Sequence, residues 1–437
     1  MKEAGALEEQ QIAPANHATR KALAARLAMP AAALFWCALA AYLGPLRARH
    51  VDWPRQISNV FEIWESFPAS SHLYLPFLTP KDFQRGIPYT HFPPTFLLGL
   101  YFYIDRIEAW LGVPLVVAQN FVFVPYIALL AGTALALLPQ IAPRQGMSEL
   151  RRLFILWLSC GIFLTNSSQW TSFIPGTVNF HGLAAILFLW LGVLGYQDKL
   201  YSKPCFKLLL VLAILAPLYA IVALIVLSLL YEGEIWISRS ERASRKMRSL
   251  QPAAKAAFAV LAVALIVAFL PKAVFYLLGE FYREGGSKVG FRSGLDGDAK
   301  YFGNMIEAAL WPFPKSRKSH ALHMPLIVLG ALFYCRVSPA RSALAGRLGR
   351  LWLICCSPYF FNLVFFPQAV SIHPYLFDTF LTLGSSFVLA LGSLELDRRE
   401  PLRSHLVLVW FFASSAIIMT NLIDISRAWR MLVSSMP

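Results

Sequence analysis

Long uninterrupted apolar runs are the feature that most constrains this chain. A helix needs about 20 apolar residues to cross the hydrocarbon core of a bilayer, which is about 30 Å thick. The clearest runs extend over about 26–46, 112–139, 178–196, 206–230, 256–279, 321–336, 351–367, 375–394 and 405–423, and shorter ones over about 92–105 and 153–165. They predict an all-α polytopic membrane protein with about 11 transmembrane helices, within about 10–13.

The composition agrees with this prediction and excludes several classes of protein. Of the 437 residues, 57% are hydrophobic and only 14% are charged, whereas soluble domains carry about 25% charged residues. These values exclude a soluble enzyme, a disordered chain and a disulfide-stapled secreted module. The net charge is +15, but too little polar surface remains for the exposed basic face that a nucleic-acid binder needs. We therefore expect membrane lipids as partners and no nucleic acid.

Basic loops predict the orientation, because short cytoplasmic loops are rich in Lys and Arg. Basic residues near the start of the chain and the basic loops at 231–255, 336–350 and 398–403 are expected inside. Residues 1–25 would then form a cytoplasmic tail. The remainder, 26–437, would be a single transmembrane domain. Its long extracytoplasmic loops would cover about 47–91 and 280–320.

The basic residues Arg144, Arg151 and Arg152 conflict with this orientation. They favour the cytoplasm, yet counting crossings from the first helix places them outside. We therefore expect a broken or hairpin helix between residues 92 and 230. Pro217 is the candidate break, because proline interrupts a helix.

The loop at about 47–91 carries the richest candidate chemistry. Residues 56–66 place four apolar side chains at helical spacing, namely Ile57, Val60, Phe61 and Trp64. This spacing predicts an amphipathic helix at the membrane surface. Asp52 precedes it, flanked by His50 and Arg55. Its carboxylate could act as a general base on an incoming hydroxyl, or it could only cap the helix or pair with Arg55.

Two motifs near this loop resemble those of the GT-C glycosyltransferases. The resemblance is closest to the bacterial mannosyltransferases that use polyprenyl-phosphate-mannose. In that family an Asp soon after the first transmembrane helix is followed by Gly-x-x-Tyr and by an aromatic residue and two prolines. Here Asp52 is followed by Gly-Ile-Pro-Tyr at 86–89 and Phe-Pro-Pro at 92–94.

Two further motifs match the family with one substitution each. Gly-Thr-Val-Asn at 176–179 fits the family's Gly-Gln-x-Asn, with Thr177 in place of Gln. Leu-Ala-Pro at 215–217 fits its Leu-Lys-Pro, which lies inside a paired short helix, with Ala216 in place of Lys. Both departures concern the handling of the donor phosphate.

The resemblance implies a hexosyltransferase of the bacterial inner membrane. It would transfer a sugar from a polyprenyl-phosphate-linked donor to a hydroxyl of a lipid or glycan acceptor on the extracytoplasmic side. Asp52 would be the catalytic base. Cationic and polar groups would stabilise the leaving phosphate and bind the substrates. The candidates are His50, Arg55, Tyr89, His91, Asn179, Lys272, Arg283 and His373.

The second long loop contains one candidate metal site. Asp296 and Asp298 form an Asp-x-Asp pattern that could hold a divalent cation through carboxylate oxygens. The alternative is an ordinary solvated turn. In the same way, His91 and His373 could anchor helix ends at the interface instead of binding phosphate.

Two other functions remain open. A lipid or saccharide transporter or flippase would usually show charges in mid-membrane and a repeated hydropathy pattern, and neither is visible. The polar residues in or near the helices are Asn120, Asn179, His181 and Asn362. A noncatalytic assembly subunit of GT-C type would explain the substitutions at Thr177 and Ala216. The six cysteines lie mostly in apolar runs, which is typical of buried thiols.

Overall fold

The computed structural model describes residues 52–77, 79–84, 94–113, 118, 132–133, 179–237, 250–277, 303, 343–367, 370 and 374–399. Within these ranges the regular structure is entirely helical, which confirms the all-α prediction for this part of the chain. The helices are α2 (Asp52–Ser66), α3 (Ala69–His72), α4 (Pro80–Gln84), α5 (Pro94–Leu111), α10 (Asn179–Tyr196), α11 (Lys203–Leu215), α12 (Pro217–Ile237), α14 (Leu250–Leu277), α18 (Ala343–Phe365) and α20 (Pro374–Arg399). The expected helices at 26–46, 153–165, 321–336 and 405–423 lie outside the described residues.

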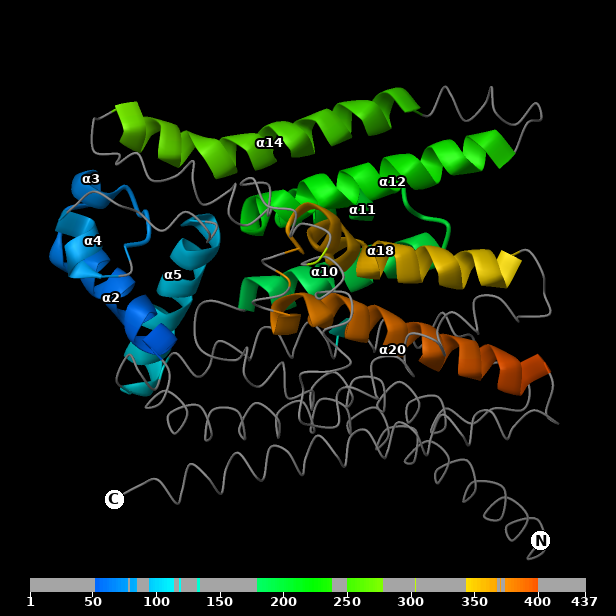
Figure 1. Cartoon of the computed structure of the whole chain (residues 1–437), viewed down its shortest axis with the longest axis horizontal. Helices are drawn as coiled ribbons and strands as arrows, with labels where there is room; N and C mark the ends of the chain where they lie inside the picture. Colours follow the sequence, from blue (N-terminus) through cyan, green and yellow to red (C-terminus); the bar gives the residue numbers. More distant parts are fainter. Residues whose placement is uncertain are drawn as a thin grey trace, which may run out of the picture.

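The longer helices α10, α11, α12, α14, α18 and α20 lie alongside one another in a bundle (Figure 1). α10 supplies much of the core, because nearly every side chain between Ala184 and Leu194 is buried. The surface of α10 is apolar on all sides, as expected for a helix surrounded by other helices. Helices also form over most of each of the predicted runs at 178–196, 256–279, 351–367 and 375–394.

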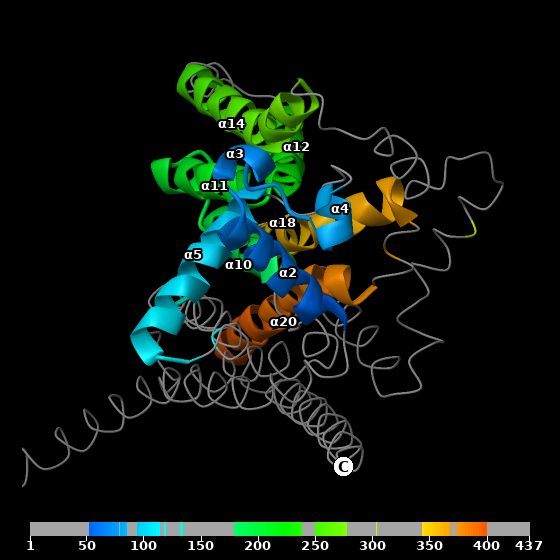
Figure 2. The same ribbon diagram turned by 90° about the vertical axis from the view of Figure 1, so that its left-hand side faces the viewer.

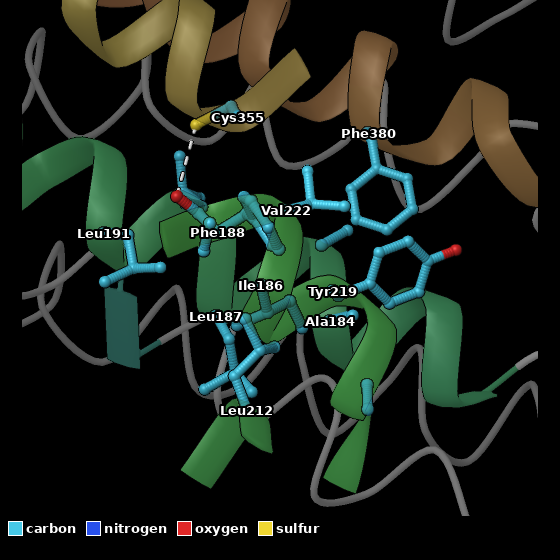
Figure 3. Packing of buried hydrophobic residues seen from close by; sticks show 14 of the residues in the cluster. Ala184, Ile186, Leu187, Phe188, Leu191, Leu212, Tyr219, Val222, Cys355 and Phe380 are labelled. Atoms are coloured by element: carbon cyan, nitrogen blue, oxygen red, sulfur yellow. Dashed lines mark hydrogen bonds between the residues drawn. The ribbon is translucent and has the colours of Figure 1, made fainter. Parts of the chain in front are cut away.

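Small residues let three of these helices approach closely. A Cβ atom added at Gly192 of α10 would lie 2.7 Å from Cys355 Sγ of α18, and one added at Gly384 of α20 would lie 2.6 Å from Cys355 Cβ. The Cys355 thiol also donates to the carbonyl oxygen of Phe188 at 3.5 Å (Figure 3). The described cysteines Cys205, Cys355 and Cys356 are buried free thiols, as the sequence predicts for them.

The apolar run at 206–230 forms two helices and not one continuous helix. α11 ends at Leu215, and α12 begins at Pro217. The Tyr201 hydroxyl before α11 donates to the Leu227 carbonyl oxygen at 3.3 Å, and the Tyr201 and Tyr231 rings are 4.9 Å apart. The two helices therefore form an antiparallel hairpin.

The break at Pro217 is confirmed, and its cause is local. Proline lacks the N–H of a helix interior and disfavours helical geometry in the residue before it. Ala216 accordingly has φ −145° and ψ 72°. Its carbonyl oxygen accepts from the N–H of Tyr219 at 2.9 Å and so starts α12. The residues from Leu208 to Leu230 on both sides of the break are almost all apolar, so hydropathy alone merges the two helices.

α2 confirms the predicted amphipathic helix, although it begins four residues earlier than 56–66 and includes Asp52. Pro54 lies in its first turn, the helical position that tolerates proline. Val60, Phe61 and Trp64 are buried, and the rings of Phe61 and Trp64 lie 5.3 and 5.7 Å from that of Tyr101 in α5. α2 and α5 thus pack as a pair.

α2, α3, α4 and α5 lie together at one end of the bundle, which we call the capped end (Figures 1 and 2). There α2 and α5 extend across the bundle instead of along it. The Thr95 hydroxyl at the start of α5 donates to the Ile214 carbonyl oxygen, so the α11–α12 turn also lies at this end.

At the opposite end of the bundle, which we call the basic end, lie the helix ends that adjoin the predicted basic loops. Here Asp198, between α10 and α11, pairs with Arg350 and with Arg347 at 3.1 Å. α12 ends at Ile237 and α14 begins at Leu250 at this end (Figure 1), so both helices extend into the predicted basic loop 231–255. The loops expected inside and outside the cell thus adjoin opposite ends of the bundle.

Large apolar side chains are exposed along the outer helices. We call the set on α11, α12 and α14 the apolar belt, and it comprises Leu210, Val211, Ile214, Leu218, Ile225, Leu229, Phe258, Leu265, Ile266, Phe269, Leu270 and Leu277. By length and hydropathy, one stretch of the described residues, Gly346–Phe365 of α18, could cross a bilayer. Shorter apolar stretches are His181–Tyr196, Pro217–Tyr231, Ala254–Leu270 and Thr379–Leu391.

Candidate functional site at the capped end

Four of the predicted site residues lie in described helices. Asp52 and Arg55 are in the first turn of α2, Asn179 is the first residue of α10, and Lys272 lies in the last part of α14. All three helices reach the capped end (Figure 1). Asp52 therefore does not precede the amphipathic helix but is its first residue.

The other predicted site residues lie outside the described residues. They are His50, Tyr89, His91, Arg283, Asp296, Asp298 and His373. Where side chains are described, no group of three or more His, Cys, Asp or Glu residues could hold a metal ion. The divalent cation at Asp296 and Asp298 stays a prediction.

A buried polar cluster joins three bundle helices at the capped end. His181 of α10 is 8% exposed, Tyr219 of α12 is 2% exposed, and Asn362 of α18 is 4% exposed. His181 Nδ1 lies 2.5 Å from Tyr219 Oη, and the Asn362 side chain hydrogen-bonds to the same hydroxyl. We call these residues the His181–Tyr219–Asn362 cluster.

Aromatic packing fixes the position of Tyr219. Its ring centroid lies 5.1 Å from that of Phe380 and 6.3 Å from that of Phe188 (Figure 3). Phe188 and Phe380 are themselves fully buried. Because Tyr219 is the third residue of α12, its hydroxyl is held at a defined point beside the α11–α12 turn.

The local chemistry of α18 fixes Asn362 in turn. Pro358 interrupts the hydrogen-bond ladder of the helix, because its nitrogen cannot donate to the Ile354 carbonyl. The Ser357 hydroxyl donates to that carbonyl oxygen at 2.8 Å, and the Asn362 amide donates to the Pro358 carbonyl oxygen at 2.7 Å. Asn362 therefore binds its own helix with one amide hydrogen and retains a second for Tyr219.

A second histidine in this region is structural. His72 of α3 is buried; its Nδ1 accepts from the Tyr74 N–H at 3.0 Å, and its Nε2 lies 3.2 Å from the Phe67 carbonyl oxygen. Burial lowers the pKa of His72 below its ordinary value, against two backbone hydrogen bonds that raise it. These bonds hold a turn in which Leu73 and Tyr74 both have positive φ.

From the sequence, His181 and Asn362 are expected as polar residues in or near helices and not as site residues, and Tyr219 is not predicted. A tyrosine inside an apolar run is ordinary core packing by pattern alone. The break at Pro217 is the signal that could have pointed to Tyr219. A polar residue two positions after a break lies close to the same neighbouring helices as the break itself.

Comparisons with known proteins add no relative. No protein family model matches the chain, and no curated protein matches it either.

Proposed function

We propose that the protein is a membrane glycosyltransferase that acts at the capped end. It would transfer a sugar from a polyprenyl-phosphate-linked donor, mannose by resemblance, to a hydroxyl of a lipid or glycan acceptor. One observation carries this proposal. Asp52, the start of α5, Asn179 and the Ala216–Pro217 turn come from distant parts of the sequence, yet all belong to helices that meet at this end.

The apolar belt supports a membrane location. Charged residues normally cover the outer helices of a soluble bundle, because exposed apolar area is costly in water. Here residues 256–270 of α14 include no charged residue, and Phe258 and Phe269 are 73% and 60% exposed. The stretch Gly346–Phe365 of α18 is also long and apolar enough to cross the hydrocarbon core.

Two features of the fold suggest how the basic residues near 144–152 can lie in the cytoplasm, where their charge favours them. If α5 lies on the extracytoplasmic surface, the run at 112–139 crosses inward and places Arg144, Arg151 and Arg152 in the cytoplasm. If the α11–α12 hairpin enters from the cytoplasm and returns there, the basic loop 231–255 is also inside. The capped end then faces outward, and the C-terminus after the run at 405–423 is extracytoplasmic.

In the proposed reaction Asp52 removes the proton from the acceptor hydroxyl. The acceptor oxygen forms a bond to the anomeric carbon, and the bond between that carbon and the phosphate oxygen breaks. The phosphate leaves with the electron pair, so polyprenyl phosphate is the second product. Asp52 belongs to a helix that lies across the bundle end, the position from which a lipid-anchored donor and a water-borne or lipid acceptor are both accessible.

The proposal is tested by the Asp52→Asn substitution in cells, with lipid-linked glycans profiled by mass spectrometry. General-base catalysis contributes about 100- to 10,000-fold, so the product should disappear. Glu62→Gln is the matched control, because Glu62 is an exposed carboxylate on the same helix. Product at the wild-type level with Asp52→Asn would show that Asp52 is not the base.

A noncatalytic GT-C-like subunit is the second candidate. Ala216 favours it, because this position is 3% exposed and offers no cation where the family carries a lysine. Such a subunit would be needed for glycan assembly in cells, but the purified protein would form no glycosidic bond. A transfer assay with the purified protein therefore separates the two functions.

A further inference from the structure

We infer that an anionic glycerophospholipid of the cytoplasmic leaflet binds on the outer surface of α11 and α14, with its headgroup at Lys203, Lys207 and Lys255. Its acyl chains lie along the apolar belt of the same two helices. The inference rests on the membrane location that the proposed function requires and not on the sugar transfer.

The outward face of α11 changes from charged to apolar along the helix. Lys203 and Lys207 are exposed, and Leu210 and Ile214 further along are 40% and 41% exposed. Steps of four, three and four residues place these side chains on one side of a helix. The buried residues of α11 lie on the opposite side, and they are Cys205, Leu209, Leu212 and Ala213. The lysines therefore stand at the beginning of a stripe that faces away from the bundle.

α14 has the same pattern on its outward face. Lys255 is exposed, and Phe258, Ile266 and Phe269 on the same side are 73%, 55% and 60% exposed. The buried residues on the other side are Val260 and Ala264. As on α11, three positions separate the last lysine from the first exposed large apolar side chain. Two helices thus change from charged to apolar in the same way.

The arrangement of the two helices brings these patterns to one surface. α11 and α14 pack against each other, and both run from the basic end to the capped end (Figure 1). The three lysines therefore lie at the same end of a shared apolar surface. From Phe258 to Leu270 that surface extends about 18 Å along α14, longer than the roughly 15 Å of hydrocarbon in one leaflet. It provides a cationic end for a headgroup and an apolar length for acyl chains.

The charge of the headgroup follows from the lysines. An ammonium group beside a phosphate forms a charge-assisted hydrogen bond, and basic residues at a membrane surface attract anionic lipids. The first turn of α11 contains no acidic residue, and Asp198 before it already pairs with Arg347 and Arg350. Phosphatidylcholine carries a cation that the lysines repel, so phosphatidylglycerol is the better partner.

The test uses native mass spectrometry of the full-length protein in detergent, with phosphatidylglycerol and phosphatidylcholine of matched acyl chains as probes. One variant combines Lys203→Gln, Lys207→Gln and Lys255→Gln. A second variant has arginine at the same three positions and so keeps the charge. Lys81→Gln combined with Arg106→Gln is the control, because both of these basic residues are exposed at the capped end.

We expect the wild type to bind phosphatidylglycerol at least about 10-fold more tightly than phosphatidylcholine. A basic residue near an anionic lipid surface changes binding about fivefold, so the glutamine variant should lose at least about 10-fold in phosphatidylglycerol affinity. Its phosphatidylcholine affinity and thermal midpoint should change little. The arginine variant and the capped-end control should bind phosphatidylglycerol as the wild type does.

Three results would overturn the inference. The first is equal binding of the two lipids by the wild type, as expected if the lysines only fix the orientation of the chain. The second is an unchanged preference in the glutamine variant, or an equal loss in the capped-end control. The third is displacement of phosphatidylglycerol by an equal concentration of inorganic phosphate, because the acyl chains would then contribute nothing.

A measurement on the wild type covers the case in which the variants do not fold. In nanodiscs, a photoreactive phosphatidylglycerol should label the peptides that contain residues 203–214 or 255–270, and excess phosphatidylglycerol should compete where phosphatidylcholine does not. Labelling only elsewhere would contradict the proposed site. A preference for phosphatidylglycerol at these lysines without any sugar transfer would refute the proposed function alone. Sugar transfer by a protein that lacks this preference would refute the lipid site alone.

Discussion

Gly384 of α20 lies directly against Cys355 of α18, so that an added Cβ would be 2.6 Å from Cys355 Cβ. Gly384→Ala should therefore destabilise the bundle by about 1–3 kcal/mol through overpacking. Thermal unfolding in detergent measures this. Gly349→Ala on α18 is the control, because nothing lies within 4 Å of its added Cβ; it should be neutral or stabilising.

Gly192→Ala should respond differently from Gly384→Ala when Cys355→Ala is added. Its nearest obstacle is Cys355 Sγ at 2.7 Å, and Cys355→Ala removes that atom. Cys355→Ala should therefore partly rescue Gly192→Ala but not Gly384→Ala, whose obstacle is the Cβ that alanine retains. Equal rescue of both variants would contradict the packing described here, and a double-mutant cycle measures the difference.

The Thr95 hydroxyl satisfies a carbonyl that the break in the α11–α12 hairpin leaves without its helical partner. Because the helix ends at Leu215, the Ile214 carbonyl oxygen accepts from Thr95 instead. Thr95→Val keeps the shape and removes the donor, so we expect a loss of about 1 kcal/mol in unfolding free energy. Thr95→Ser should restore most of it. A Thr95→Ser variant as unstable as Thr95→Val would show that the methyl group matters and the hydroxyl does not.

The fold of α3 should depend on pH through His72. Its pKa is lowered in the folded protein, so the unfolded state binds the proton more tightly, and stability falls as pH drops below about 6.5. Hydrogen exchange of the amides around Tyr74 should accelerate in that range. In His72→Asn, whose side chain can accept from the Tyr74 N–H but does not titrate, the pH dependence should vanish. Its persistence would assign the effect to another group.

The proposed orientation predicts that the C-terminus is extracytoplasmic. An alkaline phosphatase fused after Pro437 should be active in bacterial cells, and a green fluorescent protein fused there should be dark. A cysteine placed at Gly146, beside Arg144 and Arg151, should resist membrane-impermeant maleimides in intact cells. A bright fluorescent fusion would contradict the proposed orientation, in which α5 does not cross the membrane and the α11–α12 hairpin returns to the cytoplasm.

The sequence predicted those parts of the fold that leave a local signal. The spacing of Val60, Phe61 and Trp64 marked α2, and Pro217 marked the break between α11 and α12. It left open whether the helix is broken or forms a hairpin there, because a break does not by itself give the direction of the second arm. It also could not show that α5 lies across the bundle, since an apolar helix has the same composition in either orientation.

The candidate site was predictable to a similar extent. The motifs at Asp52 and Asn179 pointed to helices that do meet at the capped end. The His181–Tyr219–Asn362 cluster was not predictable, because its members lie on three helices and only packing brings them together. A polar residue in an apolar run shows that a partner exists without showing which residue it is.

The proposed sugar transfer with Asp52 as the base is tested most directly by a transfer assay. Purified protein in nanodiscs is supplied with labelled polyprenyl-phosphate-mannose and lipid extract as the source of acceptor, and labelled product is separated from donor. We predict product from the wild type and from Glu62→Gln, and a loss of at least about 100-fold with Asp52→Asn. Product from Asp52→Asn at the wild-type rate would contradict the role of Asp52, and its absence from the wild type would favour the noncatalytic subunit.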